Sequence, residues 1–330
     1  MAKIAVEFEP ISRFRALGHA PGQLASRVLA RGDGWSVSDL ICRAGPHDRP
    51  FEEQHSGACI AIVTAGSFQY RSSTGRALMT PGSLLLGNAG QYFACGHEHG
   101  VGDRCISFSY ESQYLERLAA EAEVGSACFS TLRVPPVREF SGLVARASAR
   151  VAGSRSTTPD CEQSTLISES EKRTRNSLEH ASSSGPGMTD WEEIGFELAA
   201  RALEFAGSDE PNRGTFPAAE ARVTRIVRLI ENHPDVEHGL GALAREAKLS
   251  RYHFLRIFQQ LAGLTPHQYL LRARLRRAAI RLLREPAHVL DIALDSGFGD
   301  VSNFNHAFRA EFGVSPRSYR QNARPRLSGV

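Results

Sequence analysis

The residues best suited to chemistry lie in a short segment of the N-terminal half. The sequence there reads Cys95-Gly-His97-Glu-His99, and Asp103 and Cys105 follow. Thiolate, imidazole and carboxylate groups are ligands for Zn²⁺ and other borderline metals. In a strand, residues 95, 97 and 99 would point to one face. Cys95, His97, His99 and Cys105 are therefore candidate ligands of a metal or parts of a redox sensor. The alternative is a polar loop with two free thiols packed as small apolar groups.

A second group of candidate residues lies in the last third of the chain, which compares with itself at an offset of 50 residues. Phe254 and Phe258 match Phe304 and Phe308, and the sequence GLTP at 263–266 matches GVSP at 313–316. Each copy is typical of a short helix, a turn and a second helix. Two copies are too few for a solenoid, so we expect a tandem pair of helix-turn-helix units.

The second helix of each unit could read DNA. Ser250 and Asp300 are placed to cap these helices, and the phenylalanines mark their buried faces. A recognition helix presents its N-terminal residues to base edges in the major groove. Arg256 could bond guanine and Asn303 adenine. The candidate DNA contacts are Arg251, Tyr252, Leu255 and Arg256 in the first unit, and Val301, Ser302, Asn303 and His306 in the second. Solvated surface on a basic helical bundle is the alternative.

Residues 221–322 resemble the DNA-binding domain of AraC-type transcription regulators. The residues that carry the resemblance are Ile292-Ala-x-x-x-Gly297-Phe298-x-Asp300-x-Ser302-x-Phe304-x-x-x-Phe308-Arg309 and Gly313-x-Ser315-Pro316-x-x-Tyr319-Arg320. The resemblance implies two helix-turn-helix units, joined by a long helix, that read two adjacent segments of the major groove. His306 stands where family members often carry arginine, which leaves the base preference of the second unit open. The arginines between the units could meet phosphates or support the units; they are Arg272, Arg274, Arg276, Arg277 and Arg281.

Residues 1–110 are typical of a β-barrel or two-sheet sandwich, because short apolar or alternating runs are separated by turn residues. We expect strands at Leu24–Ala30, Trp35–Cys42, Ala58–Thr64, Phe68–Arg71, Ser83–Leu86 and Cys105–Tyr110. The resemblance extends here to a cupin-like barrel that binds an effector, and the turn and strand at Pro81–Leu86 fit that barrel. Helices expected at 111–124, 137–151 and 191–206 would then serve dimerisation.

The remaining stretches complete an α+β multidomain chain. Residues 153–189 are rich in Ser and Thr and predict a disordered insertion, and residues 207–218 predict a linker. The C-terminal domain, 219–322, is expected to be all helix. Its helices are expected at 219–232, 240–247, 251–261, 266–284, 289–296, 301–311 and 316–322.

Charge is distributed unevenly between the two halves. The net charge of the 330 residues is +3, but residues 221–330 hold 18 Lys and Arg against 9 Asp and Glu, and residues 1–220 hold 21 against 27. A basic part joined to an acidic part hints at nucleic-acid binding by the basic part. No membrane span or signal peptide is expected, and six scattered cysteines suit reduced thiols in the cytoplasm.

Together these features predict an effector-responsive, DNA-binding transcription regulator, most simply an activator, and not an enzyme. The implied partners are double-stranded promoter DNA, RNA polymerase, a second copy of the chain and a small-molecule effector. The alternative is a metal-dependent cupin enzyme with a basic helical appendage, using His47, His55, His97 or His99. A catalytic cupin normally has a His-x-His pair early in its barrel, whereas His47 and His55 are eight residues apart.

Overall fold

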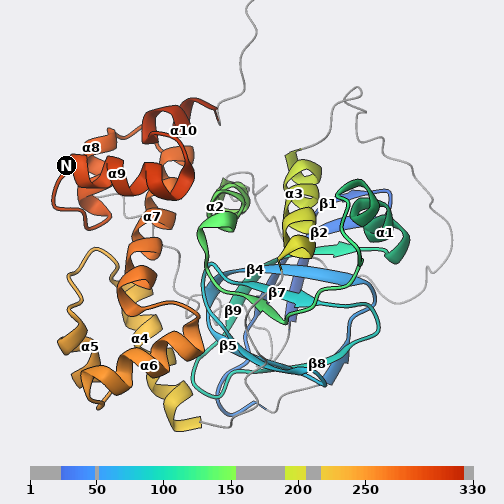
Figure 1. Ribbon diagram of the computed structural model, residues 1–330, viewed down its shortest axis with the longest axis horizontal. Coiled ribbons are helices and arrows are strands. Elements are labelled where there is room, and N and C mark those ends of the chain that lie inside the picture. The colour runs from blue at the N-terminus through green and yellow to red at the C-terminus, as the bar shows by residue number, and fades with distance from the viewer. Residues whose placement is uncertain (1–23, 49–51, 154–189, 206–216, 323–330) are drawn as a thin grey trace, which may run out of the picture.

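The computed structural model describes residues 24–48, 52–153, 190–205 and 217–322. Its N-terminal domain contains the strands and three helices, and its C-terminal domain is entirely helical (Figure 1). The predicted fold class is confirmed. The predicted insertion and linker fall almost wholly outside the described ranges, so they remain predictions. Among the helices within these ranges, none is long and apolar enough to cross a membrane.

Two antiparallel sheets build the N-terminal domain and enclose a core between them. Their strands are β1 (Leu24–Gly32), β2 (Trp35–Cys42), β3 (Glu52–Gln54), β4 (Ala58–Gly66), β5 (Phe68–Ser72), β6 (Gly75–Met79), β7 (Leu84–Gly87), β8 (Tyr92–Gly96), β9 (Asp103–Tyr110) and β10 (Arg133–Val134). One sheet has the order β1-β2-β9-β4-β7-β10 and the other the order β3-β8-β5-β6.

The alternation of side chains along each strand separates two apolar cores. In β4, Ile60 and Ile62 point to one face of the six-stranded sheet, whereas Ala61 and Val63 point to the other. This is the two-residue period of a strand. The first face packs against helices, and the second belongs to the cluster that includes Phe68 and other residues of the second sheet.

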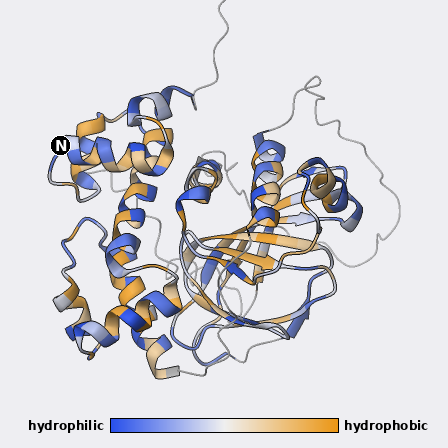
Figure 2. Cartoon of the chain, in the orientation of Figure 1, coloured by the Kyte–Doolittle hydropathy of each residue, from blue (hydrophilic) through white to orange (hydrophobic). Residues whose placement is uncertain are grey.

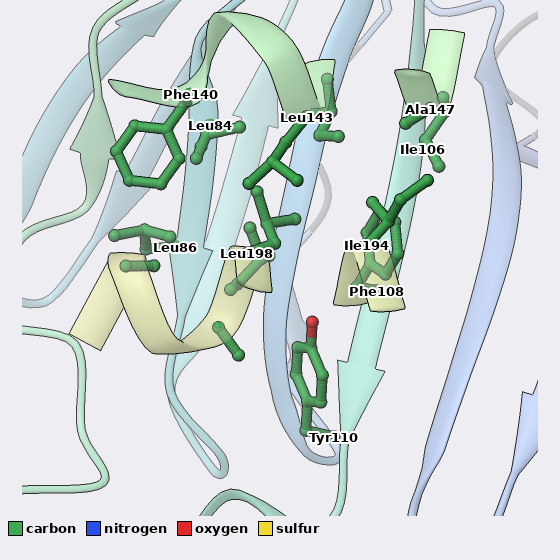
Figure 3. Packing of buried hydrophobic residues seen from close by; sticks show 14 of the residues in the cluster. Leu84, Leu86, Ile106, Phe108, Tyr110, Phe140, Leu143, Ala147, Ile194 and Leu198 are labelled. Carbon is green, nitrogen blue, oxygen red and sulfur yellow. The ribbon is translucent and has the colours of Figure 1, made fainter. Parts of the chain in front are cut away.

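Three helices cover the outer face of the six-stranded sheet: α1 (Ser112–Glu121), α2 (Arg138–Gly153) and α3 (Asp190–Glu204). Phe140 and Leu143 from α2 and Leu198 from α3 lie in the same core as Leu84 and Phe108 from the strands (Figure 3). The hydroxyl of Tyr110 on β9 donates a hydrogen bond of 2.7 Å to the carbonyl of Gly195. This bond satisfies a polar group inside the core, where an unpaired one would be costly.

Four strands were not anticipated, namely β3, β6, β8 and β10. Strand β3 has the sequence Glu-Glu-Gln and is fully exposed, so it has no apolar pattern to reveal it. Strand β8 ends at Gly96, and therefore His97 and His99 follow the strand in a loop. The expectation that residues 95, 97 and 99 share one strand face is not met.

The C-terminal helices are α4 (Pro217–Asn232), α5 (Leu240–Glu246), α6 (Arg251–Ala262), α7 (Pro266–Arg284), α8 (Val289–Asp295), α9 (Val301–Phe312) and α10 (Pro316–Asn322). Helices α5 and α6 form the first helix-turn-helix unit, α8 and α9 form the second, and α7 joins them (Figure 1). Figure 2 shows blue and orange stretches following one another along these helices, as expected for helices with one buried face.

The internal repeat is visible in the packing. Phe258 meets Tyr269 edge-on at 5.8 Å and 80°, and Phe308 meets Tyr319 at 5.3 Å and 77°. Edge-to-face contacts of this kind are favourable between aromatic rings. The two units therefore use the same ring geometry to build separate cores.

The two domains pack on each other chiefly through α2 and α7. Ala145 and Ala149 of α2 share a core cluster with Leu275, Ala278 and Ala279 of α7. Small side chains on both helices allow close approach of the backbones. Helix α2 is thus buried on two sides, by its own sheet and by the C-terminal domain.

Candidate nucleic-acid interface

The N-terminal end of α6 is open to solvent. The Ser250 hydroxyl caps the helix by accepting from the amide of His253, which confirms the predicted cap. Arg251, Tyr252 and Arg256 are exposed, with Tyr252 at 76%, and Leu255 is half-buried. An aromatic side chain this exposed is uncommon and suits contact with a partner.

The N-terminal end of α9 is arranged in the same way but carries less charge. Asp300 caps the helix by accepting from the amide of Asn303 at 2.7 Å. Ser302, Asn303 and His306 are exposed, and Val301 is half-buried. The eight predicted contact residues thus fall at the starts of two equivalent helices. Their contacts with DNA remain a prediction.

Helix α7 sets the separation of the two units. It has 19 residues, so at 1.5 Å per residue it is about 28 Å long. Its start is fixed by a capping box between Thr265 and Gln268, with Pro266 in the first turn. One turn of B-DNA is about 34 Å. A rigid connector of this length suits two recognition helices in successive segments of the groove.

The five arginines of α7 that the sequence singles out support the protein structure. Their guanidinium groups bond to nearby acidic side chains or carbonyls: Arg272 to Glu311 at 3.3 Å, Arg274 to the Pro234 carbonyl at 2.6 Å, Arg276 to Glu231 at 2.6 Å, Arg277 to Asp235 at 3.3 Å and Arg281 to Glu285 at 2.9 Å. Of the two roles left open by the sequence, the structure favours the supporting one.

The barrel contains the candidate metal ligands, but it groups them differently from the sequence pattern. Cys42, His97 and Asp103 offer ligand atoms that all lie within 4.8 Å of one another. His97 Nε2 is 2.6 Å from Asp103 Oδ1, and the Cys105 thiol donates to Asp103 Oδ2 at 3.3 Å. Burial alone would lower the pKa of His97, but its hydrogen bonds to Asp103 and Cys42 raise that pKa to about 9.

Cys95 and His99 are not part of this group. Cys95 lies inside the barrel, while His99 lies in the loop after β8, within electrostatic reach of Glu220 on α4. Cys42 was not among the predicted ligands. It ends β2 and is the register partner of Asp103 on β9, so only the strand pairing could have revealed it.

Three cysteines of the barrel are poor candidates for redox sensing by a thiolate. Burial raises the pKa of Cys59, Cys95 and Cys105. A reactive cysteine needs a lowered pKa and solvent access. These three side chains are expected to remain neutral thiols.

His55 and His47 occupy different surroundings. His55 Nε2 lies 2.8 Å from the Tyr70 hydroxyl, and its ring stacks on Phe93 with centroids 4.1 Å apart. Burial lowers the pKa of His55 to about 4. His47 is exposed. Neither belongs to the Cys42, His97 and Asp103 group, so the histidines named for a cupin enzyme do not converge.

Comparison with known proteins bears on the C-terminal domain. Residues 243–322 match the family model described as a helix-turn-helix domain. The HTH-type transcriptional regulator MtrA of Neisseria gonorrhoeae is 30% identical over 102 residues, and the HTH-type transcriptional activator RhaS of Escherichia coli is 39% identical over 101 residues. The C-terminal domain is a helix-turn-helix domain. The matched stretch covers 31% of this chain but only 34% of MtrA and 36% of RhaS, so the chain matches about a third of each relative.

Solved structures similar to the helix-turn-helix domain include the DNA-binding domain of AdpA in complex with a target DNA, at 29% identity and a TM-score of 0.31 over 33% of this chain and 98% of that one. A cupin superfamily protein from Desulfitobacterium hafniense is 16% identical, with a TM-score of 0.24, and covers 28% of this chain and 82% of that one.

Proposed function

We propose that this chain is a sequence-specific transcription regulator of the cytoplasm. It binds double-stranded promoter DNA as a homodimer, contacts RNA polymerase to activate transcription, and responds to a small-molecule effector through its N-terminal domain. The observation that carries the proposal is the pair of exposed recognition-helix ends held by the rigid helix α7. Dimerisation would add affinity, because the second domain binds at high effective concentration once the first is bound.

Contacts between the domains give an effector a route to the DNA-binding units. Each recognition helix touches the N-terminal domain at its C-terminal end: Arg133 donates to the carbonyl of Leu261 near the end of α6, and Ser141 of α2 donates to Glu311 near the end of α9. The opposite ends of both helices are exposed. A change in the N-terminal domain could therefore reorient both units without blocking their DNA-reading ends.

A cleft between the domains is a suitable place for the effector. Its volume is about 500 Å³, and it lies between α2, α3 and the end of α9, within the size range of small-molecule sites. Its charged lining residues are Arg138, Glu139, Arg146, Glu197, Arg201, Arg309 and Glu311. A ligand bound there would touch both domains and would favour one arrangement of them over another, in proportion to its difference in affinity.

The first experiment selects DNA from a random pool with the purified full-length protein and then footprints the selected sites. We expect protection of two major-groove segments about one helical turn apart. Binding with no preferred sequence would contradict the proposal. So would turnover of a small molecule without site-specific DNA binding, which would favour the cupin enzyme.

A charge-matched pair of variants then tests whether α6 reads bases. Arg256→Ala should weaken binding to the selected site by roughly 1–3 kcal/mol and relax the preference at one base pair. Arg225→Ala is the control, since it removes the same charge from an exposed pair with Glu246 on another helix. Equal losses in the two variants, or equal loss on every DNA sequence for Arg256→Ala, would refute base reading by Arg256.

A further inference from the structure

One end of the barrel interior brings together three kinds of metal-binding group. Cys42 is the last residue of β2, Asp103 is the first residue of β9, and the two are register partners. His97 follows the last residue of β8 in the other sheet. The group therefore joins both sheets at the point where these three strands begin or end. The His97 ring also stacks on Phe68 of β5, with ring centroids 5.8 Å apart.

The geometry is compatible with a tetrahedral ion. The three ligand atoms lie within 4.8 Å of one another, and all three residues are buried. Donors at about 2.0–2.3 Å from zinc lie roughly 3.3–3.8 Å apart. His97 Nε2 and Asp103 Oδ1, now at 2.6 Å, would need to separate by less than about 1 Å to admit the ion.

We propose that Cys42, His97 and Asp103 form a binding site for a zinc-type divalent ion, with a fourth position open to water. The ion replaces the proton shared by His97 and Asp103 and the thiol proton of Cys42, and both protons are released to solvent. Sulfur, nitrogen and oxygen donors in one site favour zinc or cobalt over magnesium or calcium, which take oxygen ligands. The Cys105 thiol, bonded to the second oxygen of Asp103, orients the carboxylate.

The position of the site gives the ion a structural consequence. His97 and Asp103 are the two ends of a loop that reaches helix α4 of the DNA-binding domain. The Arg228 guanidinium lies directly against Gly100, so close that a Cβ there would be 2.2 Å from it. Glu98 in the same loop is paired with Arg71. An ion at the neck of the loop would hold these contacts in one arrangement.

The test uses the full-length protein after treatment with a chelator. Adding Co²⁺ alone should produce one equivalent of a tetrahedral complex with thiolate-to-cobalt charge-transfer absorption, and native mass spectrometry with Zn²⁺ should show one bound ion. Absence of a bound ion in the wild-type protein would overturn the proposal and would mean that the three residues form only a hydrogen-bonded closure. This result does not depend on the folding of any variant.

Variants assign the site. Cys42→Ser should abolish the charge-transfer band, and Asp103→Asn should weaken binding of the ion. Cys105→Ala should weaken it by about 10- to 100-fold, as expected for a residue that orients a ligand. Cys59→Ser is the matched control, because Cys59 is another barrel cysteine but bonds to Ser107. A band that survives Cys42→Ser, or is lost equally in Cys59→Ser, would contradict the assignment.

Hydrogen exchange tests the link to the loop. Zn²⁺ should slow amide exchange in residues 97–103 of the wild-type protein and leave exchange in β1 unchanged. Unchanged exchange in the loop with one ion bound would place the ion elsewhere and overturn the assignment.

Discussion

An ion pair between the domains offers a direct way to measure how firmly they are docked. Arg76 on β6 and Glu220 on α4 lie 2.7 Å apart, and the Glu220 side chain is only 2% exposed. Glu220→Gln keeps the size of the side chain and removes its charge. The variant leaves the Arg76 cation facing a neutral amide in a place with little water.

The size of the effect follows from the geometry. At 2.7 Å and an effective dielectric constant of about 20, the Coulomb attraction is about 6 kcal/mol. Desolvation offsets much of it, and burial raises the pKa of Glu220 despite the attraction of Arg76. Removing one partner of a buried pair typically costs about 3–5 kcal/mol. The lower end applies, because glutamine still accepts a hydrogen bond. A loss of about 3 kcal/mol corresponds to roughly a 100-fold decrease in the equilibrium constant for docking of the two domains.

Amide hydrogen exchange in β6 and in the first turns of α4 reports this loss, because undocking exposes both segments to solvent. We expect exchange there to accelerate up to about 100-fold, limited by the free energy of docking itself. Glu246→Gln is the control, since its pair with Arg225 is about half exposed on both sides and should contribute less than about 1 kcal/mol. The reasoning is refuted if Glu220→Gln leaves exchange within twofold of the wild type, or if both variants behave alike.

Two further predictions concern single positions. The pKa of His55 is lowered to about 4 in the folded protein, from 6.5 in the unfolded chain. As the pH drops from about 6.5 to about 4, His55 is therefore protonated in the unfolded chain but not in the folded protein, and the free energy of unfolding should fall. His55→Gln should flatten this part of the pH dependence of the urea midpoint; parallel curves for the two proteins would contradict it. Gly263 and Gly313 end equivalent helices with positive φ, but a Cβ would meet Pro135 at 2.6 Å only at Gly263. Gly313→Ala should lower the free energy of unfolding by about 1–2 kcal/mol because of the left-handed backbone. Gly263→Ala should lower it more, as measured by urea unfolding. Equal losses would mean that Pro135 moves aside without cost.

The helices of the C-terminal domain could be predicted to within a residue or two, because their signals are local. Ser250 and Asp300 cap the N-terminal ends of the two recognition helices, and Gly263 and Gly313 cap their C-terminal ends. Apolar residues at helical spacing then decide which face is buried. The exposure of Arg256 and Asn303 followed from those signals alone.

The barrel could be predicted only in outline. Strands with alternating or continuous apolar character, such as β4, can be recognised. Strands β3 and β10 cannot, because a strand of two or three residues is too short to show a pattern and is defined by its partner. Helix α2 shows the same limit in another form. Leu143 and Ala147 are four residues apart, as expected for one buried face of a helix, and they pack on the sheet. Ala145 and Ala149 have the same spacing, but only the contact with α7 shows that they form a second buried face.

The sequence by itself determined the tandem helix-turn-helix units, the residues at the exposed starts of their recognition helices and the contrast between a basic and an acidic half. The first two depend on caps, glycines and periodicity that lie close together in the sequence, and the third on composition alone. Only the tertiary structure decided that the arginines of α7 bind acidic side chains and carbonyls of the protein itself, that α2 is held between two domains, and that Cys42 meets His97 and Asp103. Each of these depends on strand register or on the packing of distant segments, and a one-residue shift in register would send a side chain such as Cys42 to the opposite face.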